Sequence, residues 1–324
     1  MDSVHHDANP LFTAVSGPVR HLFQLLRCIA FATKAQVRIT PEGIRFTVEE
    51  SRVVQGVAFL EKSLFTSYNY APPTSSQTDD TAVFQISLAA LLETLQILLV
   101  NEIKDRWASR DPAYGGMMGA LGRGGRPAAF GNRVLGMPGV CRLSYAAKGE
   151  PLCVVLEEGG VTTSCEMVTY EPEDQEEIPF QRDALTLKII MRSTWLHDAV
   201  NELSSTSPSR LTMAASPSAP YLVLSSKGPL GSAAVEFSKD QQLLETFQVP
   251  KRTVNTYKYS LIKAATRAMS LASKVCIRGD EQGVLSLQFM IEVEDVGVHF
   301  IDFRFVPFLP EEGEDDLESD DEMS

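Results

Sequence analysis

The chain has 324 residues, of which 44% are hydrophobic, 22% charged and 8% aromatic, and its formal charge is −13. This composition excludes a disordered or fibrous protein, and the length predicts two domains. The longest apolar stretch, 86–100, is too short for a membrane span and contains Glu93, so we expect no membrane partner. The N-terminal residues lack the basic and apolar regions of a targeting peptide, which predicts a protein of the cytosol or nucleus.

The negative charge is concentrated in two short runs. Nine acids and no Lys or Arg lie in 311–324, a pattern typical of a solvated, disordered tail. The run from Glu171 through Glu177 contains five more acids. Without these fourteen acids the formal charge is about +1, so the folded body is expected to be nearly neutral and able to present one basic face.

The first half of the chain alternates between strand and helix periodicity. A strand from Leu11 leads into an amphipathic helix that begins near Pro18, a residue suited to a first helical turn. A strand at 81–87 leads into a second helix, for which Ser87 is the expected N-cap. Three strands are expected after each helix, at 35–40, 43–51, 53–60, 141–147, 151–160 and 161–172.

The second half repeats this order. A strand at 185–193 precedes a helix at 194–205, and a strand at 253–260 precedes a helix at 260–273. Three strands again follow each helix, at 210–216, 220–226, 232–238, 274–280, 284–294 and 297–308. Four similar units of one helix behind antiparallel strands predict sheets on the outside and four helices on one side.

The repeat also sets the expected domain boundaries. They are a flexible N-terminus at 1–10, a first domain at 11–170, a connector at 171–184, a second domain at 185–309 and a disordered acidic tail at 310–324. A segment with nine glycines, 105–139, interrupts the first domain where the sister unit has only a short connection. It is therefore predicted to be a surface insertion.

Four stretches in both halves carry a family resemblance. They are GIRFTVEESRVVQGVAFL (43–60), VLEEGGVTTSCEMVTYEPED (155–174), NTYKYSLIKAATRAM (255–269) and KVCIRGDEQGVLSLQFMI (274–291). Together they resemble the Rad-one (Rad1) subunit family of the DNA-damage checkpoint clamp, the nine-one-one complex. The resemblance implies an α+β, PCNA-like DNA clamp fold (the processivity fold), with two similar domains, antiparallel sheets outside and four helices on the inner face.

The resemblance also implies a function. A noncatalytic subunit of this kind joins two paralogous clamp subunits in a heterotrimeric ring around double-stranded DNA, without reading its sequence. In the nucleus, such a ring is placed on DNA by a clamp loader and recruits checkpoint and repair proteins in the DNA damage response. Some members of the family have been described as exonucleases, so the alternative is a 3'-5' DNA exonuclease acting in repair. A third possibility is a scaffold that binds partners and never touches DNA.

Two of the expected helices carry a basic stripe. Lys263 and Arg267 are four residues apart, and Lys274 follows the helix. The first helix has Arg20 and Arg27 on one stripe, with Lys34 just beyond it. Flexible cations that follow a phosphate backbone release counterions without reading bases, so these six residues are the expected DNA-facing set. The alternative is a merely solvated helix face.

The other two helices lack such a stripe. One offers His197, Asp198, Asn201 and Glu202, and the other offers only Glu93 and Gln96 as polar groups. DNA contact would therefore be uneven around a ring made from this chain alone. We expect a heteromer, in which the partner subunits supply the remaining positive charge.

The segment 169–183 joins the halves and combines two prolines with clustered acids, as a semi-extended linker does. In the family it resembles, the groove beside the connector receives short partner motifs. Ile178, Pro179 and Phe180 are therefore expected to border a partner-binding site. The alternative is that they only anchor the linker.

The residues suited to catalysis or metal binding do not form a convincing site. Two-metal nucleases need several converging carboxylates, and adjacent acids on a strand point to opposite faces. The carboxylate candidates are Glu49, Glu50, Glu157, Glu158, Glu292, Glu294 and Asp295. Neither the five histidines nor the five cysteines have the spacing of a zinc site, and we expect reduced cysteines, no cofactor, no metal and no catalytic residue. GRGGRP in the insertion lacks the ending of a phosphate loop, and contact of this loop with nucleic acid stays open.

Overall fold

The computed structural model describes residues 10–16, 18–71, 81–97, 140–158, 161–173, 176–294 and 296–309. The expected insertion at 105–139 and the expected tail at 310–324 lie outside the described residues, as do residues 1–9 of the expected flexible N-terminus. Helical residues 88–97 follow β6 directly. The other elements of the first half are β1 (Phe12–Ser16), α1 (Val19–Cys28), β2 (Lys34–Thr40), β3 (Gly43–Glu50), β4 (Val54–Glu61), η1 (Lys62–Leu64), β5 (Ser67–Tyr70), β6 (Ala82–Ser87), β7 (Val140–Tyr145), β8 (Leu152–Glu158) and β9 (Val161–Met167).

The second half has a similar order of elements. They are β10 (Leu185–Arg192), α4 (Ser193–Leu203), η3 (Ser204–Thr206), β11 (Arg210–Ala215), β12 (Leu222–Gly228), β13 (Gly231–Phe237), β14 (Leu244–Gln248), β15 (Thr253–Lys258), α5 (Tyr259–Ala264), α6 (Thr266–Leu271), β16 (Lys274–Asp280), β17 (Leu285–Val293) and β18 (Gly297–Phe305). The helix expected at 260–273 is thus divided at Ala265, whose N–H donates to the Ile262 carbonyl in a tighter turn.

Two strands were not predicted from the sequence, β5 and β14. Each pairs with the first strand of its half, β5 with β1 and β14 with β10. Both are short and lie at the edge of a sheet, so their alternation of apolar residues is weak. Pairing with the neighbouring strand, rather than local periodicity, therefore sets their conformation.

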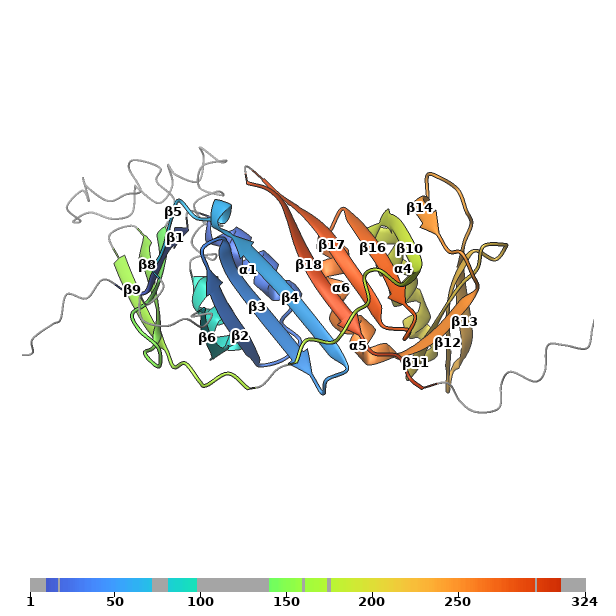
Figure 1. Cartoon of the computed structure of the whole chain (residues 1–324), viewed down its shortest axis with the longest axis horizontal. Helices are drawn as coiled ribbons and strands as arrows, with labels where there is room; N and C mark the ends of the chain where they lie inside the picture. Colours follow the sequence, from blue (N-terminus) through green and yellow to red (C-terminus); the bar gives the residue numbers. More distant parts are fainter. Residues whose placement is uncertain are drawn as a thin grey trace, which may run out of the picture.

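The strands form three antiparallel sheets (Figure 1). A nine-stranded sheet has the order β14-β10-β16-β17-β18-β4-β3-β2-β6. A five-stranded sheet, β5-β1-β7-β8-β9, closes one end, and a four-stranded sheet, β13-β12-β11-β15, closes the other. The halves join where β18 pairs with β4, with Phe303 opposite Gly56.

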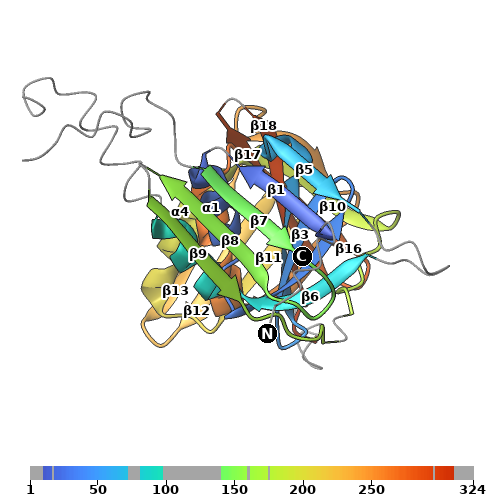
Figure 2. The same cartoon turned by 90° about the vertical axis from the view of Figure 1, so that its left-hand side faces the viewer.

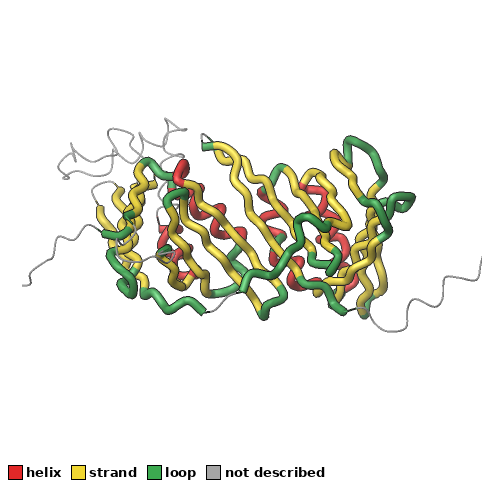
Figure 3. Tube along the Cα trace, in the orientation of Figure 1, coloured by secondary structure: helices red, strands yellow, loops and turns green. Residues whose placement is uncertain are grey.

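The helices lie on one face of the nine-stranded sheet, between the two end sheets (Figures 2 and 3). α1 packs against β4, α4 against β10 and β16, and α6 against β17. Alternate residues of the nine-stranded sheet point to this face and form the core together with inward-facing residues of the end sheets. The largest fully buried side chains include Phe289, Phe303 and Phe305 of the nine-stranded sheet and Phe12 and Tyr145 of the five-stranded sheet. We call this the helix face, and the opposite one the outer face.

The described part of the connector, 171–173 and 176–184, crosses the outer face as an extended segment (Figure 1). Glu177 forms ion pairs with Arg45 on β3 and Arg304 on β18. Farther along, the Gln181 N–H donates to Asp280 at the end of β16. The connector therefore bridges strands of both halves before it enters β10.

Candidate nucleic-acid interface

α1 positions Arg20 and Arg27. Its apolar residues, such as Leu22 and Leu26, are buried against the sheet, which leaves the two arginines on the opposite side of the helix. Arg27 is exposed, with its guanidinium 5.6 Å from the centre of the Phe23 ring. The Arg20 Nη2 lies 2.9 Å from the Glu294 Oε2. A surface ion pair contributes at most about 1 kcal/mol, so Arg20 can exchange this carboxylate for a phosphate.

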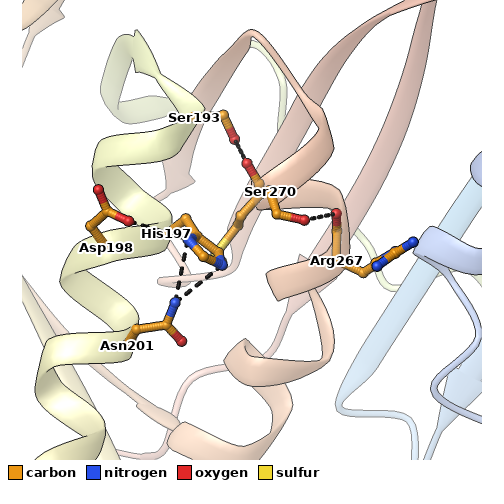
Figure 4. A network of polar contacts seen from close by, with 7 residues as sticks. Ser193, His197, Asp198, Asn201, Arg267 and Ser270 are labelled. Carbon is orange, nitrogen blue, oxygen red and sulfur yellow. Dashed lines mark hydrogen bonds and ion pairs between the residues drawn. The ribbon is translucent and has the colours of Figure 1, made fainter.

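α5 and α6 present Lys263 and Arg267, which are both exposed. The turn at Ala265 separates the two helices. Ile262 on α5 and Met269 on α6 are both buried, so the two helices turn the same side toward the core. Arg267 points away from α4 and toward α1 (Figure 4). Its charge acts to lower the pKa of the Cys28 thiol on α1, although burial of that thiol dominates and raises its pKa to about 12. Because α1 packs against α6, cations from both halves meet on one helical surface.

Lys34 and Lys274 do not join this surface, although the sequence placed them at the ends of the two basic stripes. Each is the first residue of a strand, β2 or β16, and successive strand residues alternate between faces. Their neighbours Ala35 and Val275 are buried, so both lysines lie on the outer face. Lys34 Nζ lies 5.0 Å from the centre of the Tyr170 ring, and Lys274 Nζ lies 2.7 Å from Glu245 Oε2. Each stripe therefore ends with its helix.

The remaining helical surface is neutral or acidic. On α4, His197 contacts Asp198 and Asn201, as Figure 4 shows, and Glu202 is exposed. Ser193 at the start of α4 donates instead to the Met269 carbonyl at 2.8 Å, so it forms no catalytic pair with His197. Helical residues 88–97 expose Glu93, Gln96 and Ile97, and Ser87 accepts a hydrogen bond from the Ala90 N–H as the predicted N-cap.

The connector residues singled out from the sequence take different positions. Ile178 is buried, and its carbonyl accepts a hydrogen bond from Arg304 Nη1 at 2.6 Å. Phe180 lies beneath the Arg278 guanidinium, with 5.7 Å between the guanidinium carbon and the ring centre, whereas Pro179 is exposed. Ile178 and Phe180 thus anchor the connector, and Phe180 also lines a cavity of about 410 Å³ beside it.

Sequence reasoning missed the arginines of this cavity. Arg38, Arg45, Arg278 and Arg304 come from four different strands, and Arg182 comes from the connector. Each strand arginine alternates with buried apolar residues, which was the one available signal that it points to the outer face. Their convergence depends on strand pairing between distant parts of the chain.

Among the described residues, no three His, Cys, Asp or Glu side chains are placed to hold a metal ion. Glu49 accepts a hydrogen bond from the Arg52 N–H at 2.6 Å and so stabilises the turn after β3. Asp295 and the side chain of Glu158 lie outside the described residues. All five cysteines are free, and burial also raises the pKa of the Cys141 thiol to about 12, which favours an inert thiol. No helix in the described part of the chain is long and apolar enough to span a membrane.

Antiparallel sheets with helices on one face define an α+β protein whose helical surface carries cations from both halves. Residues 11–291 match the family model "Repair protein Rad1/Rec1/Rad17". This match covers most of the chain, and the chain therefore belongs to the Rad1 family, whose fold is PCNA-like.

Individual relatives agree with this membership. The DNA damage checkpoint control protein rad1 of Schizosaccharomyces pombe is 32% identical over 313 residues, which cover 96% of this chain and 89% of that protein. The human cell cycle checkpoint protein RAD1 is 34% identical over 292 residues, 89% of each chain. The DNA repair protein Rad1 of Drosophila melanogaster is 23% identical over 305 residues, which cover 92% of this chain and 94% of that protein.

Proposed function

We propose that this protein is a noncatalytic subunit of a heterotrimeric sliding clamp, which encircles double-stranded DNA in the nucleus and recruits checkpoint and repair proteins after DNA damage. One observation carries the DNA contact: α1 and α6, from opposite halves, bring Arg27 and Arg267 to one exposed surface. The names of the relatives, which are checkpoint and repair proteins, support the cellular role.

The ends of the molecule favour assembly into a ring. β9 and β13 are edge strands of the five- and four-stranded sheets, and they lie at opposite ends of the long axis (Figure 1). An open edge offers unpaired backbone groups for pairing with another chain, and β9 begins with Val161, which is 67% exposed. Two different edges at opposite ends suit head-to-tail contacts, which close into a ring when the rotation permits.

The uneven charge of the helices favours a heteromeric ring. Lys263 and Arg267 have no counterpart among the exposed residues of α4, where Asp198 and Glu202 would repel phosphates. A ring of three copies would repeat this weakness three times. Two paralogous subunits that carry cations at the corresponding positions would complete the lining.

In this proposal the chain has two clamp domains, 11–170 and 185–309, joined by the connector at 171–184. Arg20, Arg27, Lys263 and Arg267 contact phosphates without reading bases, which permits sliding. The groove beside Ile178, Pro179 and Phe180 receives motifs of checkpoint and repair partners, and a clamp loader opens the ring. No described residue is assigned a nuclease role, so purified protein with Mg²⁺ should release no nucleotides from labelled DNA.

Charge reversal on the helices tests the proposal. The complex, assembled with its two partner subunits, would be loaded on closed circular DNA with the double variant Lys263→Glu/Arg267→Glu. We expect at least a tenfold loss of retention and a decrease of about two in the slope of log affinity against log salt. The matched control reverses the two outer-face lysines, Lys34→Glu/Lys274→Glu, and should keep retention within about twofold of the wild type. Full retention by the helix variant would rule out this DNA-facing surface.

A further inference from the structure

The cavity beside the connector is built mainly from arginines. Five guanidiniums line it, those of Arg38, Arg45, Arg182, Arg278 and Arg304. Strand register brings them together: Arg38 lies opposite Arg45 across β2 and β3, while Ser286 on β17 lies opposite both Arg278 and Arg304. Such a concentration of guanidiniums on one sheet face is unfavourable unless anions approach it.

Acids within the described residues offset only part of this charge. Glu177 pairs with Arg45 at 2.6 Å and with Arg304 at 3.4 Å. Asp302 lies 4.0 Å from Arg278, and no other carboxylate lines the cavity. Arg38 and Arg182 are exposed and form no ion pair with any residue that the structure describes. Positive charge is therefore left over for an additional anion.

Gln55 is a second, independent sign of a ligand. Gln55 is on β4, where it lies opposite Arg304 of β18. Its side chain lines the cavity and is only 1% exposed. Neither its side-chain nitrogen nor its oxygen has a hydrogen-bond partner among the described residues, and the buried Arg278 Nε also has none. Buried polar groups are normally paired, because an unpaired one loses its bonds to water without replacement. A bound carboxylate would accept hydrogen bonds from both nitrogens.

The cavity also has an apolar side. Val57, Phe59 and Phe180 line it together with the arginines. A ligand that fits this combination carries several carboxylates and an occasional apolar side chain. The segment 311–322 of this chain has that composition, with nine acids and Leu317 among them.

The end of the described chain lies near the cavity. After Arg304, the Val306 N–H donates to the Val53 carbonyl, Pro307 packs against Gly283, and the Phe308 N–H donates to the Thr256 carbonyl. Leu309 is the last described residue, five positions beyond Arg304. Five extended residues span at most about 17 Å and the twelve residues of 311–322 about 40 Å, so the segment is long enough to return to the cavity.

We propose that the acidic segment 311–322 of this chain docks in the arginine-lined cavity, with its carboxylates on the guanidiniums. Carboxylates pair with guanidiniums through two parallel hydrogen bonds, which suits the clustered arginines. If the groove also receives partner motifs, which rests on the proposed function, a partner must displace this segment first. The docking itself needs neither DNA nor another subunit.

A synthetic fluorescent peptide with the sequence of residues 310–324 tests the docking by anisotropy on the purified full chain. One variant replaces every Asp and Glu of 311–322 by Asn and Gln, so that its cavity is vacant. We expect this variant to bind the peptide at least fivefold more tightly than the wild type, whose own segment competes. Adding Arg38→Gln/Arg182→Gln to it should weaken binding at least tenfold, and because both side chains are exposed the substitutions should change stability by under about 0.5 kcal/mol each.

The matched control adds Lys188→Gln/Lys274→Gln, which removes two outer-face cations that line a neighbouring hollow, and it should bind the peptide unchanged. Equal binding by the wild type and the acid-free variant would show that the chain's own segment does not occupy the cavity and would overturn the proposal. Insensitivity to the arginine substitutions would overturn it too. Both measurements use the isolated chain, so either failure leaves the DNA retention test unaffected.

Discussion

The two faces of the nine-stranded sheet differ most clearly along β18. His299, Ile301, Phe303 and Phe305 alternate toward the helix face and are buried. Phe300, Asp302 and Arg304 alternate toward the outer face and remain partly or fully accessible. The same nine-residue strand thus contributes to the core that joins the halves and to the cavity beneath the connector.

The cations of the two faces are arranged differently as well. On the helix side they are exposed and spread over separate helices, with Arg27 on α1 and Lys263 on α5. On the outer face five arginines converge around one cavity, where Arg45 and Arg304 pair with Glu177 and Arg278 lies near Asp302. Dispersed flexible cations suit a polyanion that moves, whereas converging guanidiniums suit an anion held in one place.

The two faces should differ most in how much stability the protein loses when an aromatic ring is removed. Phe303 is fully buried and packs against Phe31, Phe289 and Phe305 at ring distances of 5.9 Å. Phe303→Ala should lower the free energy of unfolding by about 3–5 kcal/mol, measured by urea denaturation. Phe300→Ala, on the outer face and 44% exposed, is the matched control and should cost under about 1 kcal/mol. Equal losses would contradict the assignment of the faces.

Adding a methyl group to the core on the helix face should cause a smaller loss of stability. A Cβ at Gly56 would lie 2.7 Å from the Phe31 ring and 3.2 Å from the Phe303 ring, at the junction of the halves. Gly56→Ala should therefore destabilise the protein by about 1–3 kcal/mol, because the partly buried Phe31 ring must shift and the Phe303 ring on its other side is fully buried. An unchanged urea midpoint would show that the junction is loosely packed. Val57→Ala, its outer-face neighbour, should have the weaker effect.

The helix face also contains a pH-sensitive residue. His299 is 2% exposed, and burial lowers its pKa, while the charge of nearby Glu61 acts in the opposite direction without outweighing burial. In the unfolded chain His299 binds a proton near pH 6.5, whereas in the folded chain it binds one only at a lower pH. The free energy of unfolding should therefore fall as the pH drops below about 6.5, by up to about 1.4 kcal/mol per pH unit. His299→Leu should flatten this slope in denaturation curves at pH 7.5 and 5.5. The control His197→Gln, which changes a partly buried histidine on α4, should leave the pH dependence of stability as in the wild type.

The smallest expected effect concerns a carboxylate on the outer face. Burial raises the pKa of Asp302, although the hydrogen bond from Gln288 and the nearby arginines oppose this. The folded state therefore favours the protonated form, so stability decreases as the pH rises from about 3.8 through the raised pKa and stays lower above it. Asp302→Asn should increase the urea midpoint slightly at pH 7, leave it unchanged near pH 3, and tighten binding of the 310–324 peptide. A decrease at pH 7 would mean that pairing with the arginines outweighs burial.

Local patterns predicted much of the fold. Alternation in β18 and the helical spacing in α1 were strong because burial on one side repeats over many residues. β5 and β14 could not be predicted, because four or five half-exposed residues at a sheet edge carry little periodicity. The break in the helix at Ala265 could not be predicted either, because the residues on both sides of it favour a helix.

The same distinction between local pattern and long-range pairing applies to the candidate sites. By itself the sequence determined the recurring order of strands and helices, the acidic runs and the cations of α1, α5 and α6, because these depend on the spacing of neighbouring residues. Only the tertiary structure decided that Lys34 and Lys274 leave the helical surface, where strand alternation reverses a side chain within one residue. It also decided the arginine cavity, since pairing of β18 with β4 aligns Arg304 with Gln55 across about 250 residues, a register that no local pattern specifies.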